Sequence, residues 1–148
     1  MSSRGEVLYD LLRLVRPIVL GSARVVDEGL RGTGWTVGSR AVMEVLVVDG
    51  AATVPRVATR LSLARQNVQR QVDELVRLGH VATAPNPDHR RSVLVAPTAE
   101  GRRLFGRVHD RELADLARLA PECSVQEIAA ATEVLRSVEA AVRARWAQ

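Results

Sequence analysis

Five polar side chains close together in the chain are of the types that read the edges of DNA bases. They are Arg65, Gln66, Asn67, Gln69 and Arg70. On a helix, Gln66, Asn67 and Arg70 point most directly outward, and the other two flank them. Arginine can donate two hydrogen bonds to guanine, and asparagine or glutamine can pair with adenine in a similar way. The pattern indicates a helix suited to a major groove. The alternatives are a solvated polar face and, for the two arginines, surface ion pairs.

The neighbouring residues predict a helix-turn-helix around these side chains. A first helix, TVPRVATRL, begins at the N-cap Thr53, with Pro55 near its first turn. A turn through Ser62-Leu63 leads to a second helix, ARQNVQRQVDELVRLG, which Gly79 ends. The predicted inner faces are apolar: Val54, Val57, Ala58 and Leu61 in the first helix, and Val68, Val72, Leu75 and Val76 in the second.

A basic hairpin is predicted directly after the second helix. Two short strands, VATA and SVLVA, bracket the segment PNPDHRR, which contains Arg90 and Arg91. A helix-turn-helix followed by an arginine-bearing hairpin is the arrangement that places one helix in a major groove and a loop beside it.

The positive charge of the chain is concentrated in the same region. Residues 53–91 hold seven arginines and three acids, a net charge of +4 that equals the formal charge of the whole chain. A localised excess is what a phosphate-binding surface requires. All 21 basic residues are arginine, so a compositional bias can raise the count, but it does not explain the location.

The bulk composition indicates one compact globular protein. The 148 residues are 47% hydrophobic and 26% charged, and no apolar run approaches the roughly 20 residues that a transmembrane helix needs. The N-terminus lacks the features of a secretory signal, and a single cysteine excludes an intramolecular disulfide, so we expect a cytoplasmic protein with no membrane association. The four aromatic residues are too few for a base-stacking platform, which argues against single-stranded partners.

The remaining segments predict long helices outside the helix-turn-helix. The first covers about 6–28, and its wide apolar stripe predicts burial on more than one side, with a kink or a split at Pro17. A glycine-rich loop, 29–34, precedes a helix that begins at Thr36 or Ser39 and ends at Val48. Thr98 caps a helix of about 99–119, and a capping box from Ser124 to Glu127 starts the last, about 125–146.

These elements give a mainly α fold with a small β-hairpin. The expected divisions are an N-terminal dimerisation helix and loop (1–34), a winged helix-turn-helix lobe (35–97) and C-terminal dimerisation helices (98–148). A homodimer is favoured because one helix reads only a short half-site, whereas paired half-sites raise specificity. The alternative is a monomeric bundle that buries the apolar surface internally.

The stretches LARQNVQRQVDELVRLGHV and PNPDHRRSVLVAPTAEG resemble the recognition helix and wing of the MarR family of winged-helix transcription regulators. The element order matches over nearly the whole chain. The resemblance implies a homodimer on a palindromic operator in double-stranded DNA, acting more often as a repressor than as an activator. It assigns the five polar residues of the predicted recognition helix to the major groove, and Arg90 and Arg91, with His89 beside them, to the wing.

Two positions depart from the family pattern. The family usually has an aspartate two residues before the wing arginine, where it braces that arginine. Here His89 occupies the position, and Asp88 lies one residue earlier, so the candidates to replace the brace are Asp88 and a neutral His89. The family also often has a serine just before the recognition helix, where this chain has Ala64. That change removes an N-cap worth roughly 1 kcal/mol, and Ser62 is the nearest replacement.

The resemblance also implies a small-molecule effector, typically a phenolic or aromatic acid, bound where the first, second and fifth helices meet. The candidate lining is Tyr9, Arg13, Arg16, Trp35 and Arg40. An arginine beside an aromatic ring suits an aromatic carboxylate. The alternative for Arg13 is a solvated position on a polar face with Glu6 and Asp10.

Other chemistry finds little support in the sequence. Cys123 has neither a cationic neighbour nor a second cysteine to form a redox pair, so it is interpreted as incidental. The three histidines lack metal-ligand spacing, and no cofactor or enzyme motif is present. The acidic pair Asp73-Glu74 is interpreted as a partner for Arg70 or Arg77. A second hypothesis is a winged-helix protein-interaction module without specific DNA binding. An apolar or acidic outward face on the second helix of the helix-turn-helix would favour that module, whereas Arg65, Gln66, Asn67 and Arg70 there count against it.

Overall fold

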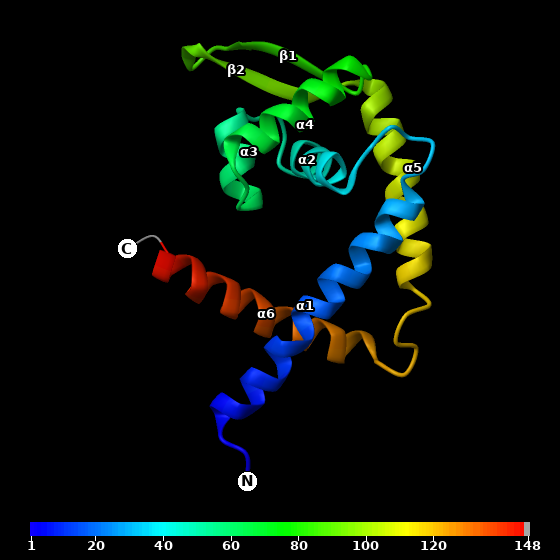
Figure 1. The fold of residues 1–148 in the computed structure, drawn as a ribbon, viewed down its shortest axis with the longest axis vertical. Coiled ribbons are helices and arrows are strands. Elements are labelled where there is room, and N and C mark those ends of the chain that lie inside the picture. Colours follow the sequence, from blue (N-terminus) through cyan, green and yellow to red (C-terminus); the bar gives the residue numbers. More distant parts are fainter. Residues whose placement is uncertain (147–148) are drawn as a thin grey trace. The chain divides into compact units, whose positions relative to one another are not determined.

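The computed structural model describes residues 1–146, which form six helices and one hairpin (Figure 1). In chain order these are α1 (Arg4–Gly29), α2 (Val37–Val48), α3 (Val54–Leu61), α4 (Arg65–Arg77), β1 (Val81–Asn86), β2 (His89–Pro97), α5 (Ala99–Leu116) and α6 (Val125–Trp146). The predicted mainly α fold with a hairpin wing is confirmed. The chain divides into two compact units, Met1–Glu112 and the residues from Leu113 on.

Side-chain caps start most of the helices where the sequence predicts. Thr36 caps α2 in a reciprocal capping box with Ser39, and Thr53 caps α3 by accepting a hydrogen bond from the Arg56 amide. In the second unit, the Ser124 hydroxyl accepts a hydrogen bond from the Glu127 amide, and the Glu127 carboxylate accepts one from the Ser124 amide. Sequence reasoning missed a further capping box at the start of α1, between Ser3 and Glu6.

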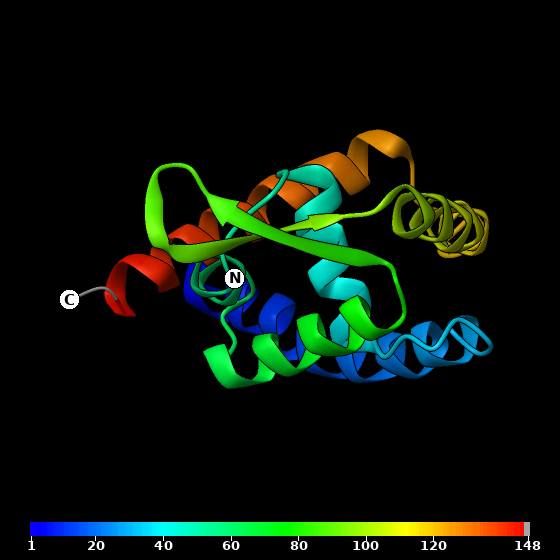
Figure 2. The ribbon, with the colours of Figure 1, turned by 90° about the horizontal axis from the view of Figure 1, so that it is seen from above.

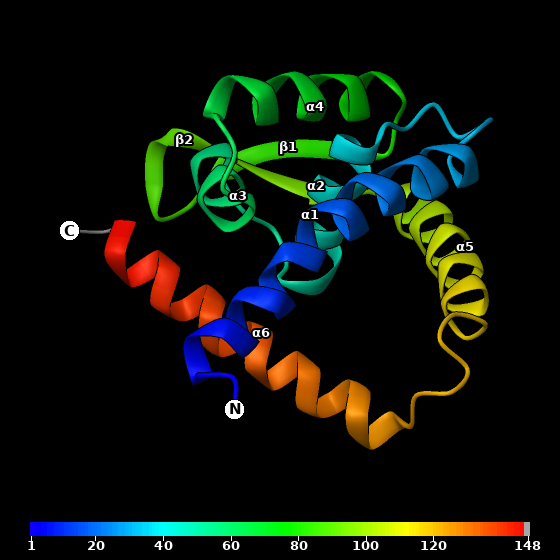
Figure 3. The ribbon, with the colours of Figure 1, turned by 60° about the horizontal axis from the view of Figure 1, so that its bottom comes forward.

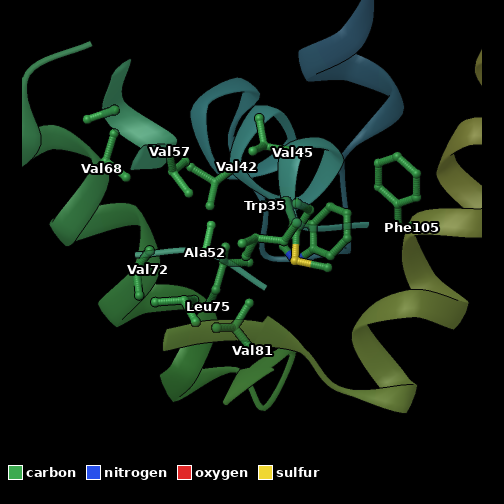
Figure 4. Packing of buried hydrophobic residues seen from close by; sticks show 14 of the residues in the cluster. Trp35, Val42, Val45, Ala52, Val57, Val68, Val72, Leu75, Val81 and Phe105 are labelled. Carbon is green, nitrogen blue, oxygen red and sulfur yellow. The ribbon is translucent and has the colours of Figure 1, made fainter. Parts of the chain in front are cut away.

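The hydrophobic core lies within the first unit, between α2, α3, α4, the hairpin and the start of α5 (Figure 4). Val57, Ala58, Val68, Val72 and Leu75 are buried as predicted, and Val54 and Leu61 pack against them. The prediction for Val76 is wrong, because its side chain is 41% exposed. Residues 68, 72 and 75 define the centre of the inner face of α4, and position 76 lies at its edge.

The structure bears on two expectations for α1. It is one helix of 26 residues with Pro17 inside it, which excludes the split and leaves the kink as a prediction. No α1 side chain is buried against the rest of the described chain, so the expected burial on several sides does not occur within one copy. The exposed apolar side chains include Leu12, Leu14, Val15, Ile18, Val19 and Leu20. Helix α6 likewise buries none of its residues within the described part of the chain.

The hairpin is longer than the sequence predicts. Strands β1 and β2 pair antiparallel from Val81 opposite Pro97 to Asn86 opposite His89, leaving a two-residue tip. The wing arginines therefore lie on β2, not in a loop. The register shifts after Pro85, which pairs with Val93, so residues 90–92 are extra on β2 and form a bulge. Figure 2 shows the two strands crossing the first unit as a twisted ribbon.

Candidate nucleic-acid interface

Helix α4 presents its polar residues to solvent because the opposite face is fixed in the core. Val68, Val72 and Leu75 anchor it against α2 and α3, and Figure 3 shows the helix at the outer edge of the first unit. All five predicted base-reading side chains are exposed: Arg65, Gln66, Asn67, Gln69 and Arg70. The helix thus offers the donors and acceptors that a major-groove contact would need.

Hydrogen bonds along α4 order some of these side chains. The Arg70 guanidinium donates to the Asn67 side-chain oxygen at 3.0 Å, and Gln69 donates to Asp73 at 2.9 Å. The predicted acidic partner is confirmed for Glu74, which pairs with Arg77. This contact lowers the pKa of Glu74 and raises that of Arg77. Arg70 is therefore held by an amide, and it forms no ion pair with a carboxylate among the described residues.

The two ends of α4 are built differently. Ala64 occupies the N-cap position of α4, and its side chain has no polar group to cap the helix. Ser62 does not replace the cap, because it is the C-cap of α3 in the left-handed conformation, with φ 55°. At the other end, the amide of Gly79 donates to Val76 and that of His80 donates to Leu75, with Gly79 at φ 77°. This is a Schellman motif, and it confirms the predicted stop at Gly79.

The wing is braced by amide and hydroxyl groups. Asn86 Nδ2 donates to Ser92 Oγ at 2.9 Å, and Asn86 Oδ1 accepts from the Asp88 amide at 3.0 Å. Ser92 Oγ in turn donates to the His89 carbonyl. Within residues 1–146, the structure gives Arg91 no ion pair with Asp88 or another carboxylate, so Asp88 does not take the place of the family's bracing aspartate. Sequence reasoning missed Asn86, although an asparagine two residues before the turn amide is a known Asx-turn signal.

His89, Arg90 and Arg91 are all exposed at the start of β2. They belong to the same unit as the polar face of α4. One compact unit therefore carries both an exposed polar helix and an exposed basic hairpin.

The residues proposed to line an effector site have diverse environments. Tyr9 is 69% exposed, Arg13 pairs with Asp10 on the surface, and Arg16 is exposed. Trp35 is buried, and its indole nitrogen donates to His80 Nδ1 at 2.9 Å.

Arg40 is already engaged with protein groups. It pairs with Glu44 and Glu112, and its guanidinium carbon lies 5.5 Å from the centre of the Phe105 ring. The Glu112 carboxylate raises the pKa of Arg40. Glu112 and Phe105 were not identified from the sequence, because they lie far along the chain.

Other candidate chemistry is not assembled in the described residues. Cys123 is exposed in the loop between α5 and α6. No group of three potential metal-ligating side chains occurs among residues 1–146. None of the described helices is both long enough and apolar enough to span a membrane.

The fold and the exposed face of α4 define a winged helix-turn-helix protein. Residues 39–92 match the model of the MarR family. An uncharacterised protein of Mycobacterium tuberculosis is 37% identical over 137 residues, which cover 93% of this chain and 90% of that protein. The chain belongs to the MarR family of transcription regulators.

Related proteins of known structure or function support the assignment. A crystal structure of a MarR family transcription regulator superposes with a TM-score of 0.82 and 27% identity, covering 97% of this chain and 95% of that one. A mutant of the Escherichia coli MarR, crystallised with operator DNA, gives a TM-score of 0.75 and 25% identity, covering 93% and 99%. The transcriptional activatory protein BadR of Rhodopseudomonas palustris is 35% identical over 85 residues, covering 57% of this chain and 47% of that protein.

Proposed function

We propose that this protein is a homodimeric, sequence-specific DNA-binding regulator of transcription, acting as a repressor on a palindromic operator. The observation that carries the proposal is the exposed set of Arg, Asn and Gln side chains on α4, in the same unit as the arginines of the wing. Arg65, Gln66, Asn67, Gln69 and Arg70 would read bases in the major groove. Arg90 and Arg91, with His89, would contact the backbone or the minor groove beside it.

The homodimer rests on the unburied apolar surface of α1 and α6. Neither helix has a buried residue within the described chain, although both carry many large apolar side chains. Exposed apolar surface of this extent marks an interface. A second copy would cover it and present two α4 helices to successive turns of DNA, about 34 Å apart.

The test of DNA binding is a titration of the purified protein against duplex DNA from its own promoter region and a scrambled duplex of equal length, across a salt series. We expect tighter binding to the native duplex and a steep fall in affinity with salt. If selection from a random-sequence duplex library also yields no preferred site, the protein is not a sequence-specific regulator and the interaction-module alternative holds.

Repression is tested separately, because BadR is described as an activator. A reporter gene placed behind the selected operator should be expressed less when the protein is present. Increased expression would reverse the proposed sign of regulation.

A small aromatic acid is proposed as the effector, bound near Tyr9, Arg13, Arg16, Trp35 and Arg40. Its carboxylate would have to compete with Glu44 and Glu112 for Arg40, since both carboxylates already occupy that guanidinium. Thermal unfolding against a panel of aromatic acids tests this idea. A ligand should raise the unfolding temperature and weaken operator binding, and no shift with any acid would remove support for the site.

A further inference from the structure

A five-residue segment before and within the first turn of α2 lies along one flank of α4. We name this segment, residues 34–38, the strap. It makes two directed hydrogen bonds to the region of α4. Thr36 Oγ1 donates to the side-chain oxygen of Gln71 at 3.1 Å, and Trp35 Nε1 donates to His80 Nδ1 at 2.9 Å. Gln71 lies in the middle of α4, and His80 follows its C-terminus.

Two glycines allow the strap to approach α4 closely. A Cβ atom on Gly34 would lie 3.2 Å from the methyl groups of Leu78, and the φ of +79° at Gly34 disfavours other residues. A Cβ atom on Gly38 would lie 3.0 Å from Gln71 Nε2. At both ends of the strap, the backbone therefore lies against side chains of α4 or of Leu78, the residue that follows α4.

The contacted residues share one side of α4. Gln71 and Leu78 are seven positions apart, which is two helical turns, and Asn67 lies one turn before Gln71. The strap therefore touches the flank that separates the buried face from the face carrying Asn67 and Arg70.

This flank is where rotation of the helix can be fixed. The core contacts of α4 are apolar and non-directional, whereas a hydrogen bond has a defined distance and angle. Rotating a helix by about 10° moves a side-chain atom some 6 Å from its axis by about 1 Å. Such a shift breaks hydrogen bonds to base edges, because a bidentate contact needs both distances to be correct.

The strap is itself held in place. Thr36 accepts a hydrogen bond from the Ser39 amide while donating to Gln71, and the buried Ser39 hydroxyl accepts from the Thr36 amide at 2.7 Å. The Trp35 amide donates to Thr33 Oγ1 at 3.0 Å. The Thr36 hydroxyl therefore points at Gln71 because its other bond, to α2, fixes its direction.

His80, which accepts the hydrogen bond from Trp35, is held by three contacts of its backbone. Its amide donates to the Leu75 carbonyl, and its carbonyl accepts from the Thr98 amide at 3.0 Å. A Cβ atom on Gly101 would lie 2.0 Å from the same carbonyl oxygen, so α5 begins in direct contact with it. Because Nδ1 accepts the indole proton, the neutral ring carries its own proton on Nε2.

We propose that the strap sets the rotation and position of α4, and thereby determines operator specificity through residues that do not contact DNA. Trp35, Thr36, Gln71 and His80 are positioning residues in this scheme. The inference rests on the proposed DNA-binding function. It gives Trp35 a role in holding α4 that differs from lining an effector site.

The test is the substitution Gln71→Met, which keeps length and helix propensity but removes the acceptor for Thr36. Affinity for the selected operator should fall about three- to tenfold, as expected if the displaced α4 loses about one hydrogen bond to a base edge. Affinity for scrambled duplex should stay unchanged, and the unfolding temperature should fall by only a few degrees, since the lost Thr36–Gln71 bond is exposed to water. Gln126→Met, an exposed position on α6, is the matched control, and Thr36→Ser should retain wild-type discrimination because it keeps the hydroxyl.

Trp35→Phe removes the second bond, but it also takes ring atoms from a side chain in the core, so it should lower the unfolding temperature as well. Discrimination between operator and scrambled duplex should also fall at temperatures where the variant is fully folded. Wild-type discrimination in Gln71→Met would overturn the proposal. So would an equal loss of specific and scrambled binding, since that result indicates general destabilisation.

A measurement without DNA separates this proposal from the proposed function. The indole N–H signal of Trp35, assigned by its loss in Trp35→Phe, should exchange slowly with solvent in the wild-type protein. It should exchange several-fold faster in Gln71→Met and not in Gln126→Met, because the strap is held as one unit. Equal exchange in all three proteins would overturn the strap even if operator binding is confirmed. A different result would count against the proposed function alone. In that case the wild-type protein would prefer no duplex, while the indole N–H of Trp35 would still exchange faster in Gln71→Met than in the wild-type protein.

Discussion

Arg40 in α2 and Glu112 in α5 form a two-point ion pair between residues 72 positions apart in the chain. Arg40 Nε donates to Glu112 Oε1 at 2.7 Å, and Nη2 donates to the second carboxylate oxygen. The side chains are 13% and 20% exposed, so the pair is largely shielded from water. It joins α5 to the second helix of the chain, at the end of α2 that also carries the strap.

Removing one partner of this pair should destabilise the first unit. We expect Glu112→Gln to lower the free energy of unfolding by about 1–3 kcal/mol, because the shielded guanidinium keeps its charge, loses the less exposed of its two carboxylate partners and retains only Glu44. Denaturant unfolding measures the effect. Glu133→Gln is the matched control. The side chains of Glu133 and Arg136 are each 70% exposed, so their ion pair should contribute little to the free energy of unfolding. Equal stability of the two variants would contradict the role given to Glu112.

Arg70→Ala should weaken binding to the selected operator by about 1–3 kcal/mol and relax the preference at one base position. The reason is that Arg70 is exposed on the outward face of α4 and held by Asn67. Selection from a random-sequence library measures the preference. Arg136→Ala on α6 serves as the control, and an unchanged preference in Arg70→Ala would exclude base reading by this residue.

Arg91→Ala should weaken binding to operator and scrambled duplex alike. An arginine that binds a phosphate reads no sequence, so discrimination should be preserved. The slope of log affinity against log salt should become shallower by about 0.9 for each phosphate that the variant no longer neutralises. An unaltered slope would show that Arg91 on β2 does not lie against DNA.

Ile18→Glu should convert the proposed dimer into a monomer. Ile18 is 62% exposed on α1, and a carboxylate there would be desolvated in the interface. Sedimentation equilibrium measures the mass. Val48→Glu is the control, because Val48 is an apolar residue of α2 that is 71% exposed. A wild-type protein that sediments as a monomer would disprove the dimer itself.

The capping box of α6 should make stability depend on pH. Hydrogen bonds from Ser124 lower the pKa of Glu127 below its ordinary value of 4.5. The folded protein therefore binds this proton less readily than the unfolded chain. The stabilisation is fully present above about pH 4.5 and is lost as the pH falls through the folded pKa. In Glu127→Gln, unfolding monitored by circular dichroism should show less stability loss over this acidic range, and a wild-type acid response would argue against the cap.

The sequence by itself determined the features that depend on neighbours in the chain. The caps at Thr36, Thr53 and Ser124 and the stop at Gly79 were predictable, because each hydrogen bond spans only a few residues. The order of helices and hairpin followed from apolar periodicity. The outward face of α4 followed as well, since burying Val68, Val72 and Leu75 leaves the opposite side exposed.

Only the tertiary structure decided the features that join distant segments. The partners in the Thr36–Gln71, Trp35–His80 and Arg40–Glu112 contacts are 35, 45 and 72 residues apart. Each depends on how closely packed elements place two side chains, which local propensity does not encode. The wing differs for a related reason: its strand length and bulge depend on cross-strand pairing, and the Asn86–Ser92 bond exists only once that register is set.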